Sequence, residues 1–236
     1  MQTLNLCLLN GVPICEQLAL EEALVRTHHE NFCIFNCGAP PAIVMGISSK
    51  TADHIDSAAF GKTPLPIIRR FSGGGTVVVD ENTLFVSFLL QRPGFSPDAL
   101  MHEVEALLKP VFAPHDFHLQ ERDFVIGEKK IGGNAQYITK NSALHHSTFL
   151  WDFDPERMAL LKMPPKMPSY RHARSHEEFC GTLETLFPSK EAFRDKLTAV
   201  LKDKFVLTII PAENLFPLTL GPHRKATQHV LFERYL

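Results

Sequence analysis

The sequence predicts an α+β fold in which helices pack on a mixed β-sheet. Short segments rich in apolar and β-branched residues alternate with longer segments that lack glycine and proline. Glycine-rich turns separate several of the short segments. The 236 residues are 44% hydrophobic and 21% charged, which is typical of a globular protein with a large core. We therefore expect one domain over residues 1–236.

The first half of the chain predicts six strands and two helices. Residues 16–26 contain helix formers without glycine or proline, and we expect the acids of this helix on its solvated face. Ser96, Pro97 and Asp98 form a helix start, with apolar residues at helical spacing after it. Short apolar segments predict strands at residues 3–9, 32–35, 42–46, 66–68, 76–79 and 84–90.

The second half predicts a hairpin, two further strands and one more helix. Residues 124–126 and 130–131 flank a turn at Gly127. Ser189 precedes a helix with apolar residues at helical spacing, and the proline-rich residues 164–168 predict a loop. The remaining predicted strands are residues 145–153 and 205–210.

The bulk properties disfavour several classes of protein. A net charge of −2 gives no reason to expect a nucleic-acid partner. No apolar run approaches the ~20 residues of a membrane span, and the first residues lack a basic signal region. The five cysteines lack the spacing of metal ligands and are expected to be reduced thiols. We expect a cytoplasmic protein without nucleic-acid or membrane partners.

A glycine loop at residues 69–80 is the strongest candidate for a binding site. Arg69 and Arg70 enter the turn, and Gly73, Gly74 and Gly75 follow. Glycines let a backbone approach a ligand closely, and their amides can bind an anion. An arginine adds a planar cation that suits a carboxylate or phosphate. The alternative is a plain glycine turn beside two surface arginines.

Two later segments give the loop a specific context. Residues 127–136 form a second glycine turn that contains Lys130, and His145-His146-Ser147-Thr148 follows. Together the three segments resemble the lipoate–protein ligase A family, over roughly residues 3–180. The family pattern is Arg-Arg-x-Ser-Gly-Gly-Gly closed by Asp, then Asn-Asp, then Lys-[Val/Ile]-Ser-Gly-Ser-Ala, then His-His-Gly-Thr. The matching residues here are 69–80, 122–123, 130–135 and 145–148.

The resemblance implies a fold, a reaction and partners. The fold is the catalytic domain of biotin and lipoate ligases, which is similar to class II aminoacyl-tRNA synthetases. The reaction uses ATP and Mg²⁺ to activate lipoic acid or octanoate as an acyl-adenylate. The acyl group then passes to a lysine of an apo lipoyl domain, in a 2-oxoacid dehydrogenase complex or the glycine-cleavage H protein. The chain resembles short members without a C-terminal accessory domain, some of which depend on a separate accessory polypeptide.

The same resemblance implies roles for individual residues. Lys130 is the candidate catalytic residue, because a compact point charge suits the space between a carboxylate and an α-phosphate. Asp123 is the candidate Mg²⁺ ligand. Cys37 and His146 are expected to line the acyl pocket, with His145 on the opposite face of its strand. The expected substrate- and ATP-binding residues are Arg70, Ser72, Gly73, Gly74, Gly75, Asp80, Lys130, Gly133, His146 and Arg174.

The chain departs from the family pattern in ways that keep two alternatives open. Cys37 lies where the family has a tryptophan, and Gly132 and Asn134 replace serines; Val79 and Arg122 also differ. One alternative is an octanoyl or lipoyl transferase of the same superfamily, which needs a cysteine nucleophile. Residues 119–124 contain none, and Cys180 has no adjacent histidine motif, so we expect Cys37 and Cys180 to be dispensable for chemistry. The other alternative is a non-catalytic module that binds acyl groups or lipoyl proteins.

Overall fold

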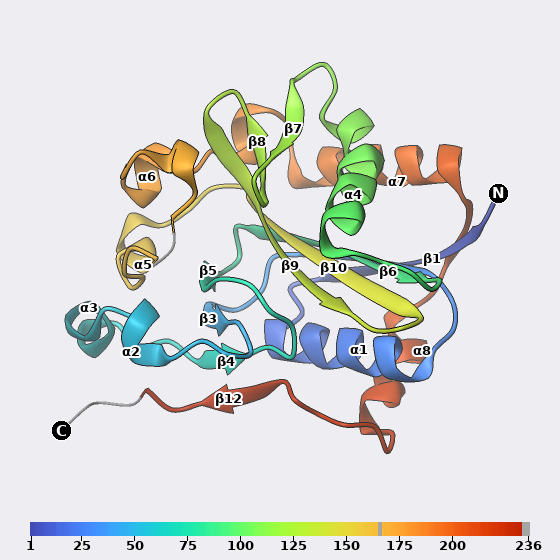
Figure 1. Ribbon diagram of the computed structural model, residues 1–236, viewed down its shortest axis with the longest axis horizontal. Coiled ribbons are helices and arrows are strands. Elements are labelled where there is room, and N and C mark those ends of the chain that lie inside the picture. Colours follow the sequence, from blue (N-terminus) through green and yellow to red (C-terminus); the bar gives the residue numbers. More distant parts are fainter. Residues whose placement is uncertain (165–166, 233–236) are drawn as a thin grey trace.

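The structure is a computed structural model that describes residues 1–164 and 167–232. Its largest element is an eight-stranded mixed sheet (Figure 1). The α+β prediction is confirmed by this arrangement of helices on mixed sheets. In spatial order the strands are β11 (Val206–Ile209), β1 (Thr3–Asn10), β2 (Phe32–Cys37), β6 (Thr83–Gln91), β10 (Ser142–Leu150), β9 (Lys129–Ile138), β8 (Asp123–Ile126) and β7 (Phe117–Gln120).

A second, four-stranded sheet holds the first glycine loop. Its order is β12 (Gln228–Val230), β4 (Ile67–Arg69), β3 (Ala42–Met45) and β5 (Val77–Val79). β3 lies between β4 and β5, so the glycine loop crosses over β3 instead of closing a simple hairpin. β2 and β3, which are adjacent in sequence, belong to different sheets.

Helices cover both faces of the large sheet (Figure 1). α4 (Pro97–Phe112) and α7 (Lys190–Lys204) pack on one face, and α1 (Ile14–Thr27) and α8 (Ala212–Leu215) pack on the other. As predicted, the hydroxyls of Ser96 and Ser189 cap α4 and α7 by accepting hydrogen bonds from backbone amides. The shorter helices are α2 (Thr51–His54), α3 (Ser57–Lys62), α5 (Pro155–Met158) and α6 (His176–Phe179), with 3₁₀ turns at Ser169–Arg171, Leu183–Thr185 and Phe216–Leu220.

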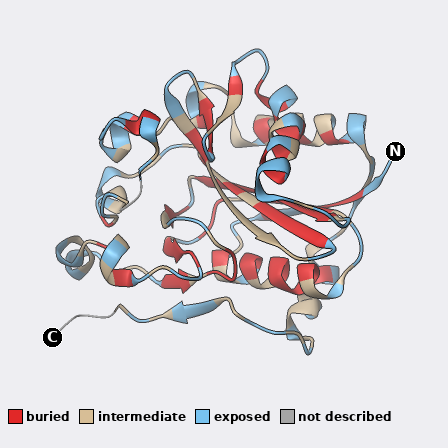
Figure 2. Cartoon of the chain, in the orientation of Figure 1, coloured by how far each residue is buried: buried red, intermediate tan, exposed pale blue. Residues whose placement is uncertain are grey.

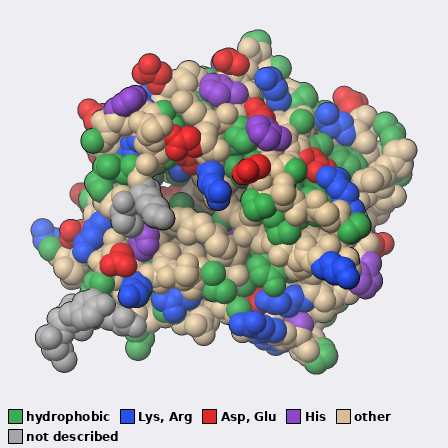
Figure 3. Space-filling view, in the orientation of Figure 1, with side chains coloured by type: hydrophobic (Ala, Val, Ile, Leu, Met, Phe, Trp, Pro, Cys, Tyr) green, Lys and Arg blue, Asp and Glu red, His purple; other side chains and the backbone are tan. Residues whose placement is uncertain are grey.

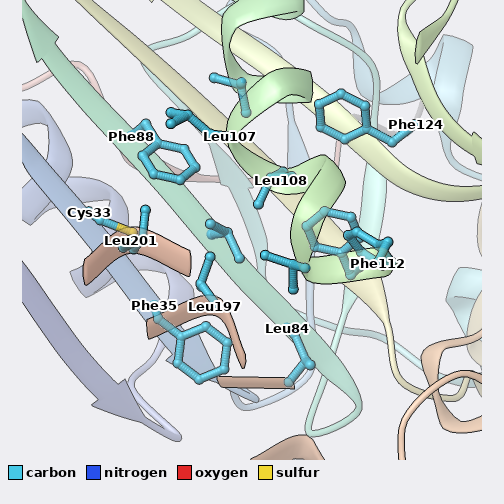
Figure 4. Close-up of a cluster of buried hydrophobic side chains, with 14 of the residues drawn as sticks. Cys33, Phe35, Leu84, Phe88, Leu107, Leu108, Phe112, Phe124, Leu197 and Leu201 are labelled. Atoms are coloured by element: carbon cyan, nitrogen blue, oxygen red, sulfur yellow. The ribbon is translucent and has the colours of Figure 1, made fainter. Parts of the chain in front are cut away.

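Successive side chains of β6 point alternately to the two faces of the sheet and join different parts of the core. Leu84, Val86 and Phe88 belong to the aromatic-rich cluster under α4 and α7 (Figure 4). Phe85 and Leu89 belong to the clusters on the α1 face. Because successive side chains of a strand point to opposite faces, one strand serves both layers. Figure 2 shows the resulting band of buried residues through the central strands and α1.

The acids of α1 correct one expectation. Glu21 and Glu22 are each 1% exposed and do not lie on a solvated face. Glu21 shares a helical stripe with Ile14 and Leu18, which faces the sheet. Glu22 is covered by the C-terminal segment, where it accepts hydrogen bonds from the amides of Ala226 and Thr227.

Most predicted elements are present, with some differences at their ends. The glycine turn predicted over residues 127–136 is wrong: only residues 127 and 128 form a turn, and Gly132 and Gly133 lie within β9. The strand predicted over residues 145–153 begins at Ser142 and ends at Leu150. β7, β12 and the short helices were not predicted. Residues 165 and 166 of the loop predicted at 164–168 lie outside the described residues. Within the described ranges, no helix is both long and apolar enough to cross a membrane.

Candidate functional site

A cavity of about 570 Å³ lies between the two sheets and is bordered by α1 and by parts of residues 158–164 and 167–180. One part of its wall is apolar and includes Ile14, Leu18 and Phe85. Another part is polar and includes the charged residues Arg70, Asp123, Lys130 and Arg171, with His176 beside them. The cavity therefore combines an apolar region with a cationic region. Elsewhere, acidic and basic side chains are interspersed over most of the face seen in Figure 3.

Arg70 is buried beneath the first glycine loop and holds it in place. Its Nη2 donates to the carbonyls of Gly73 at 3.0 Å and Gly75 at 2.7 Å, and its Nε also donates to Gly73. Its Nη1 lies 3.5 Å from the carbonyl of Val44. Burial lowers the pKa of Arg70 to about 10, so the guanidinium is charged at neutral pH. These contacts occupy four of its five N–H groups, so Arg70 mainly organises the loop.

One glycine of the loop, Gly74, is required by its backbone conformation and by a close approach. Gly74 has φ of +108°, and a Cβ there would lie 2.7 Å from Nη2 of Arg70. The amide of Gly73 donates to the carbonyl of Gln136, so it is already used within the fold. Gly74 and Gly75 line the cavity and are the two glycines of the loop that can face an anion.

Ser72, His146 and Glu21 form a hydrogen-bonded line beside the cavity. Ser72 Oγ lies 2.8 Å from His146 Nε2, and His146 Nδ1 lies 2.8 Å from Glu21 Oε2. The other oxygen of Glu21 accepts from Gln17 and Ser87. His146 and Glu21 line the cavity, whereas Ser72 is fully buried behind them. Glu21 therefore fixes the orientation of His146.

His145 faces away from the cavity and lies in a separate buried network. Its Nε2 is 3.1 Å from Asn134 Oδ1, and its Nδ1 is 3.2 Å from Gln136 Nε2. Burial lowers the pKa of His145 to about 3, so the ring is neutral at physiological pH. The expectation that the two histidines point to opposite faces agrees with this geometry.

Lys130 is half-buried at the cavity wall and paired with Asp123. Lys130 Nζ lies 2.7 Å from Asp123 Oδ1, and the hydroxyl of Tyr170 donates to Asp123 Oδ2 at 2.9 Å. Each carboxylate oxygen thus has one protein donor and keeps a further lone pair, and the role of Asp123 as a Mg²⁺ ligand stays a prediction. The described residues contain no group of three His, Cys, Asp or Glu side chains arranged to hold a metal.

Arg171, not Arg174, lines the cavity. The guanidinium of Arg174 donates to the carbonyls of Arg171, Tyr170 and Glu128, so it fastens its own segment to the β8–β9 turn. Arg171 is buried on the cavity wall, and its Nη2 contacts the sulfur of Met163. Arg174, which the resemblance placed among the substrate- and ATP-binding residues, does not line the cavity in this structure.

Cys180 lies nearer to the site than the sequence indicated. It lines the cavity and forms an isolated parallel bridge with Lys130. Lys130 and Arg171 favour its thiolate, but burial is the larger effect and raises the pKa of Cys180. The sequence did not indicate these two neighbouring cations, but the raised pKa agrees with the expectation that the thiol is not activated.

Two further candidates lie outside the cavity wall. Asn36 points toward α1, where its amide donates to Gln17, so the next residue of β2, Cys37, points to the opposite face. Cys37 packs against the core under α7 and does not line the cavity, which corrects the expected acyl-pocket role. Asp80 accepts from the amide of Asn82 and pairs with Arg157 at 2.9 Å, so it stabilises a turn.

The sequence-based prediction missed four residues of the site. Glu21, Arg171 and Cys180 line the cavity, and Tyr170 donates to Asp123. For Glu21 a signal existed, because it occupies the apolar stripe of α1. No local pattern indicates the other three. The assembled cavity suits an amphipathic carboxylate and an anionic co-substrate, because its apolar wall leads to Lys130, Arg171 and the glycine amides.

Comparison with known proteins identifies a family. A model of the lipoyl protein ligase A/B catalytic domain matches residues 13–206. The chain is 28% identical to a Plasmodium falciparum protein named inactive lipoate–protein ligase 2, over 72% of this chain and 61% of that protein. It is 29% identical to lipoate-protein ligase LplJ of Bacillus subtilis, over 57% of this chain and 42% of that protein. The chain thus spans less than two thirds of these relatives.

Solved structures show the same fold. A bipartite lipoate protein ligase from Thermoplasma acidophilum matches with a TM-score of 0.77 and 22% identity, covering 93% of this chain and 91% of that one. A lipoate-protein ligase A bound with ATP matches with a TM-score of 0.75 and 20% identity, covering 93% of this chain and 92% of that one.

Proposed function

Because the chain belongs to the lipoyl protein ligase A/B catalytic domain family, we propose that it is an ATP-dependent lipoate–protein ligase. It activates lipoate or octanoate as an acyl-adenylate and transfers the acyl group to a lysine of an apo lipoyl domain. The single observation that supports this most is the position of Lys130, at the cationic part of a cavity with an apolar wall. A relative bound with ATP and another bound with lipoic acid also support it.

The proposed chemistry has two steps. A carboxylate oxygen of the acid attacks the α-phosphate of ATP, and pyrophosphate leaves. The acceptor lysine amine then attacks the acyl carbonyl, and AMP leaves. Lys130 and Arg171 would stabilise the charge on the carboxylate and phosphate oxygens, together with the amides of Gly74 and Gly75. Mg²⁺ enters this scheme as the counter-ion of ATP, and no residue of the chain is assigned to it.

The direct test is the intact mass of an acceptor. Purified protein is mixed with ATP, Mg²⁺, lipoate and an apo lipoyl domain. We expect the acceptor to gain one lipoyl group in an ATP-dependent way. A relative crystallised as a bipartite ligase supports a parallel assay with an accessory polypeptide added. An acceptor that stays unmodified in both assays contradicts the ligase proposal.

Cys180 supports a second candidate, an acyl transferase. Its place beside Lys130 puts a thiol on the cavity wall. In that reaction the thiolate takes the acyl group from a carrier thioester, releases the carrier thiol, and passes the acyl group to the acceptor lysine. Burial disfavours the thiolate, so we expect Cys180→Ala to retain ATP-dependent acyl transfer within about threefold. Loss of transfer in folded Cys180→Ala, together with ATP-independent transfer by the parent chain, would favour the transferase.

A non-catalytic acyl-binding protein is the third candidate, and the name of the P. falciparum relative supports it. Lipoate-dependent exchange of labelled pyrophosphate into ATP distinguishes a ligase from an acyl-binding protein. A ligase catalyses this exchange without any acceptor, whereas a binding protein shows none. We expect exchange.

A further inference from the structure

Three side chains from two parts of the sequence form a hydrogen-bonded relay that leads from buried Tyr170 to the cavity wall. The hydroxyl of Tyr170 donates to Asp123 Oδ2 at 2.9 Å, and Asp123 Oδ1 lies 2.7 Å from Lys130 Nζ. Tyr170 is 8% exposed and Asp123 is 6% exposed, so both groups are shielded from water. A charge-assisted hydrogen bond in such surroundings is stronger and better oriented than one at the surface.

The direction of the relay follows from the chemistry of its members. Burial and the neighbouring Asp123 raise the pKa of Tyr170 far above its ordinary value. The phenol therefore stays protonated and is the hydrogen-bond donor. The Asp123 carboxylate accepts the hydrogen bond of Tyr170 on Oδ2 and pairs with the Lys130 ammonium through Oδ1. Because each oxygen of Asp123 has a partner, its carboxylate cannot rotate freely. The carboxylate therefore holds Lys130 Nζ in one position, although the lysine side chain is flexible.

The relay also connects two segments. Tyr170 lies in the 3₁₀ turn Ser169–Arg171, and its ring packs on Phe179 with 5.2 Å between centroids. The other end of the same segment returns to β9, where the amide of Gly181 donates to the carbonyl of Lys130 at 2.8 Å. The segment 169–181 thus contacts Lys130 in two ways. Tyr170 reaches the Lys130 side chain by way of Asp123, and the Gly181 amide binds the Lys130 backbone carbonyl.

We propose that Tyr170 is a positioning residue for Lys130, acting through Asp123, so that the ammonium is ordered only when the segment 169–181 is seated. The proposal rests on the proposed function of Lys130 in acyl-adenylate formation. It assigns Asp123 to the orientation of a cation.

The test removes one hydroxyl. Tyr170→Phe keeps the ring that packs on Phe179 and removes only the donor to Asp123. In lipoate-dependent pyrophosphate exchange we expect kcat to fall about tenfold, while KM for ATP and lipoate changes less than about twofold. The matched control is Tyr137→Phe, whose hydroxyl contacts Arg26 on α1, and we expect it to leave both parameters unchanged.

Two further measurements make the result decisive. In an Asp123→Asn background, adding Tyr170→Phe should change kcat by less than about twofold, because the relay is already broken. Brief treatment with acetic anhydride, followed by peptide mass spectrometry, reports the shielding of Lys130 independently of activity. We expect the ratio of Lys130 acetylation to that of Lys202, an exposed lysine on α7 outside the segment, to rise at least about threefold in Tyr170→Phe, because loss of the relay leaves the ammonium less shielded by Asp123.

The outcomes separate the relay from the function. An unchanged kcat together with an unchanged acetylation ratio overturns the relay. A rise in KM at constant kcat, or fully additive effects of the two substitutions, also overturns it. If the parent protein shows no exchange, the proposed function fails, and the acetylation ratio still decides whether Tyr170 orders Lys130.

Discussion

Lys130 and Lys129 are adjacent on β9 but lie in different surroundings. Lys130 is half-buried beside the cavity and paired with Asp123, whereas Lys129 is exposed and its ammonium donates to the carbonyl of Glu178. Removal of one preorganised electrostatic donor typically costs ~10²–10³ in rate. We therefore expect Lys130→Ala to lose pyrophosphate exchange by about that factor.

Lys129→Ala is the control for this prediction and should change the rate little. Lys130→Arg should not restore the rate, because the broad planar guanidinium does not replace a compact ammonium. Equal and small effects of Lys130→Ala and Lys129→Ala would remove Lys130 from the proposed site. Circular dichroism establishes that both variants are folded.

His145 gives a prediction about pH and stability. Its pKa is about 3 in the folded protein, against 6.5 for a free side chain. Between these values the unfolded chain binds more protons than the folded chain. The stability that neutral His145 contributes to the free energy of unfolding is therefore complete above about pH 6.5 and is lost as the pH falls toward 3. Lowering the pH from 7.5 to 5 should cost about 2 kcal/mol through His145.

The measurement is urea unfolding of the parent chain and of His145→Gln at pH 7.5 and 5. We expect the parent to lose about 2 kcal/mol more than the variant between the two pH values. Burial also lowers the pKa of His54 and His176, so the difference between the chains isolates His145. Identical losses in the two chains would show that His145 takes up its proton in the folded state.

At the scale of an element, β9 packs tightly at Gly132. A Cβ at this position would lie 2.7 Å from Cε1 of Phe149, a buried ring of the main core. The resemblance places a serine here, but this core is filled by Phe149. Overpacking of this kind costs about 1–3 kcal/mol, so we expect Gly132→Ser to lower the free energy of unfolding by that amount.

Gly133→Ala is the matched control on the same strand. Its added Cβ would lie 3.4 Å from the Thr148 hydroxyl, which is ordinary contact, and we expect a change within about 0.5 kcal/mol. Chemical unfolding of both variants gives the comparison. A Gly132→Ser protein as stable as Gly133→Ala would mean that Phe149 can move aside.

At the scale of the whole molecule, Glu22 joins α1 to the C-terminal segment. Its carboxylate accepts from the amides of Ala226 and Thr227 and pairs with Arg26 at 2.8 Å. Loss of a buried acceptor for several donors costs about 2–3 kcal/mol. We expect Glu22→Ala to lose about that much stability and to speed amide hydrogen exchange at residues 226–230.

Glu16→Ala, on the exposed first turn of the same helix, is the control for Glu22. It should leave both the stability and the exchange rates close to those of the parent chain. Unchanged exchange at residues 226–230 in Glu22→Ala would show that pairing of β12 with β4 alone holds the segment.

The candidate site could be predicted in part. Motif spacing indicated Arg70, Lys130 and His146, which lie together on the cavity wall. It did not indicate Tyr170, because nothing near that residue in sequence resembles a partner for Asp123. Cys37 was misplaced because its direction depends on which neighbour in β2 faces α1, and a tertiary contact with Gln17 decides that.

Local sequence patterns were enough to predict the apolar segments that form strands, the serine caps of α4 and α7, and the glycine loop between β4 and β5. These features depend on interactions within a few residues, so their signals are local. The assembled fold was needed to show that β2 and β3 join different sheets, that Glu21 and Glu22 are buried, and that Asp123 pairs with a lysine. Each of these depends on contacts between segments distant in sequence, whose pairing no local spacing specifies.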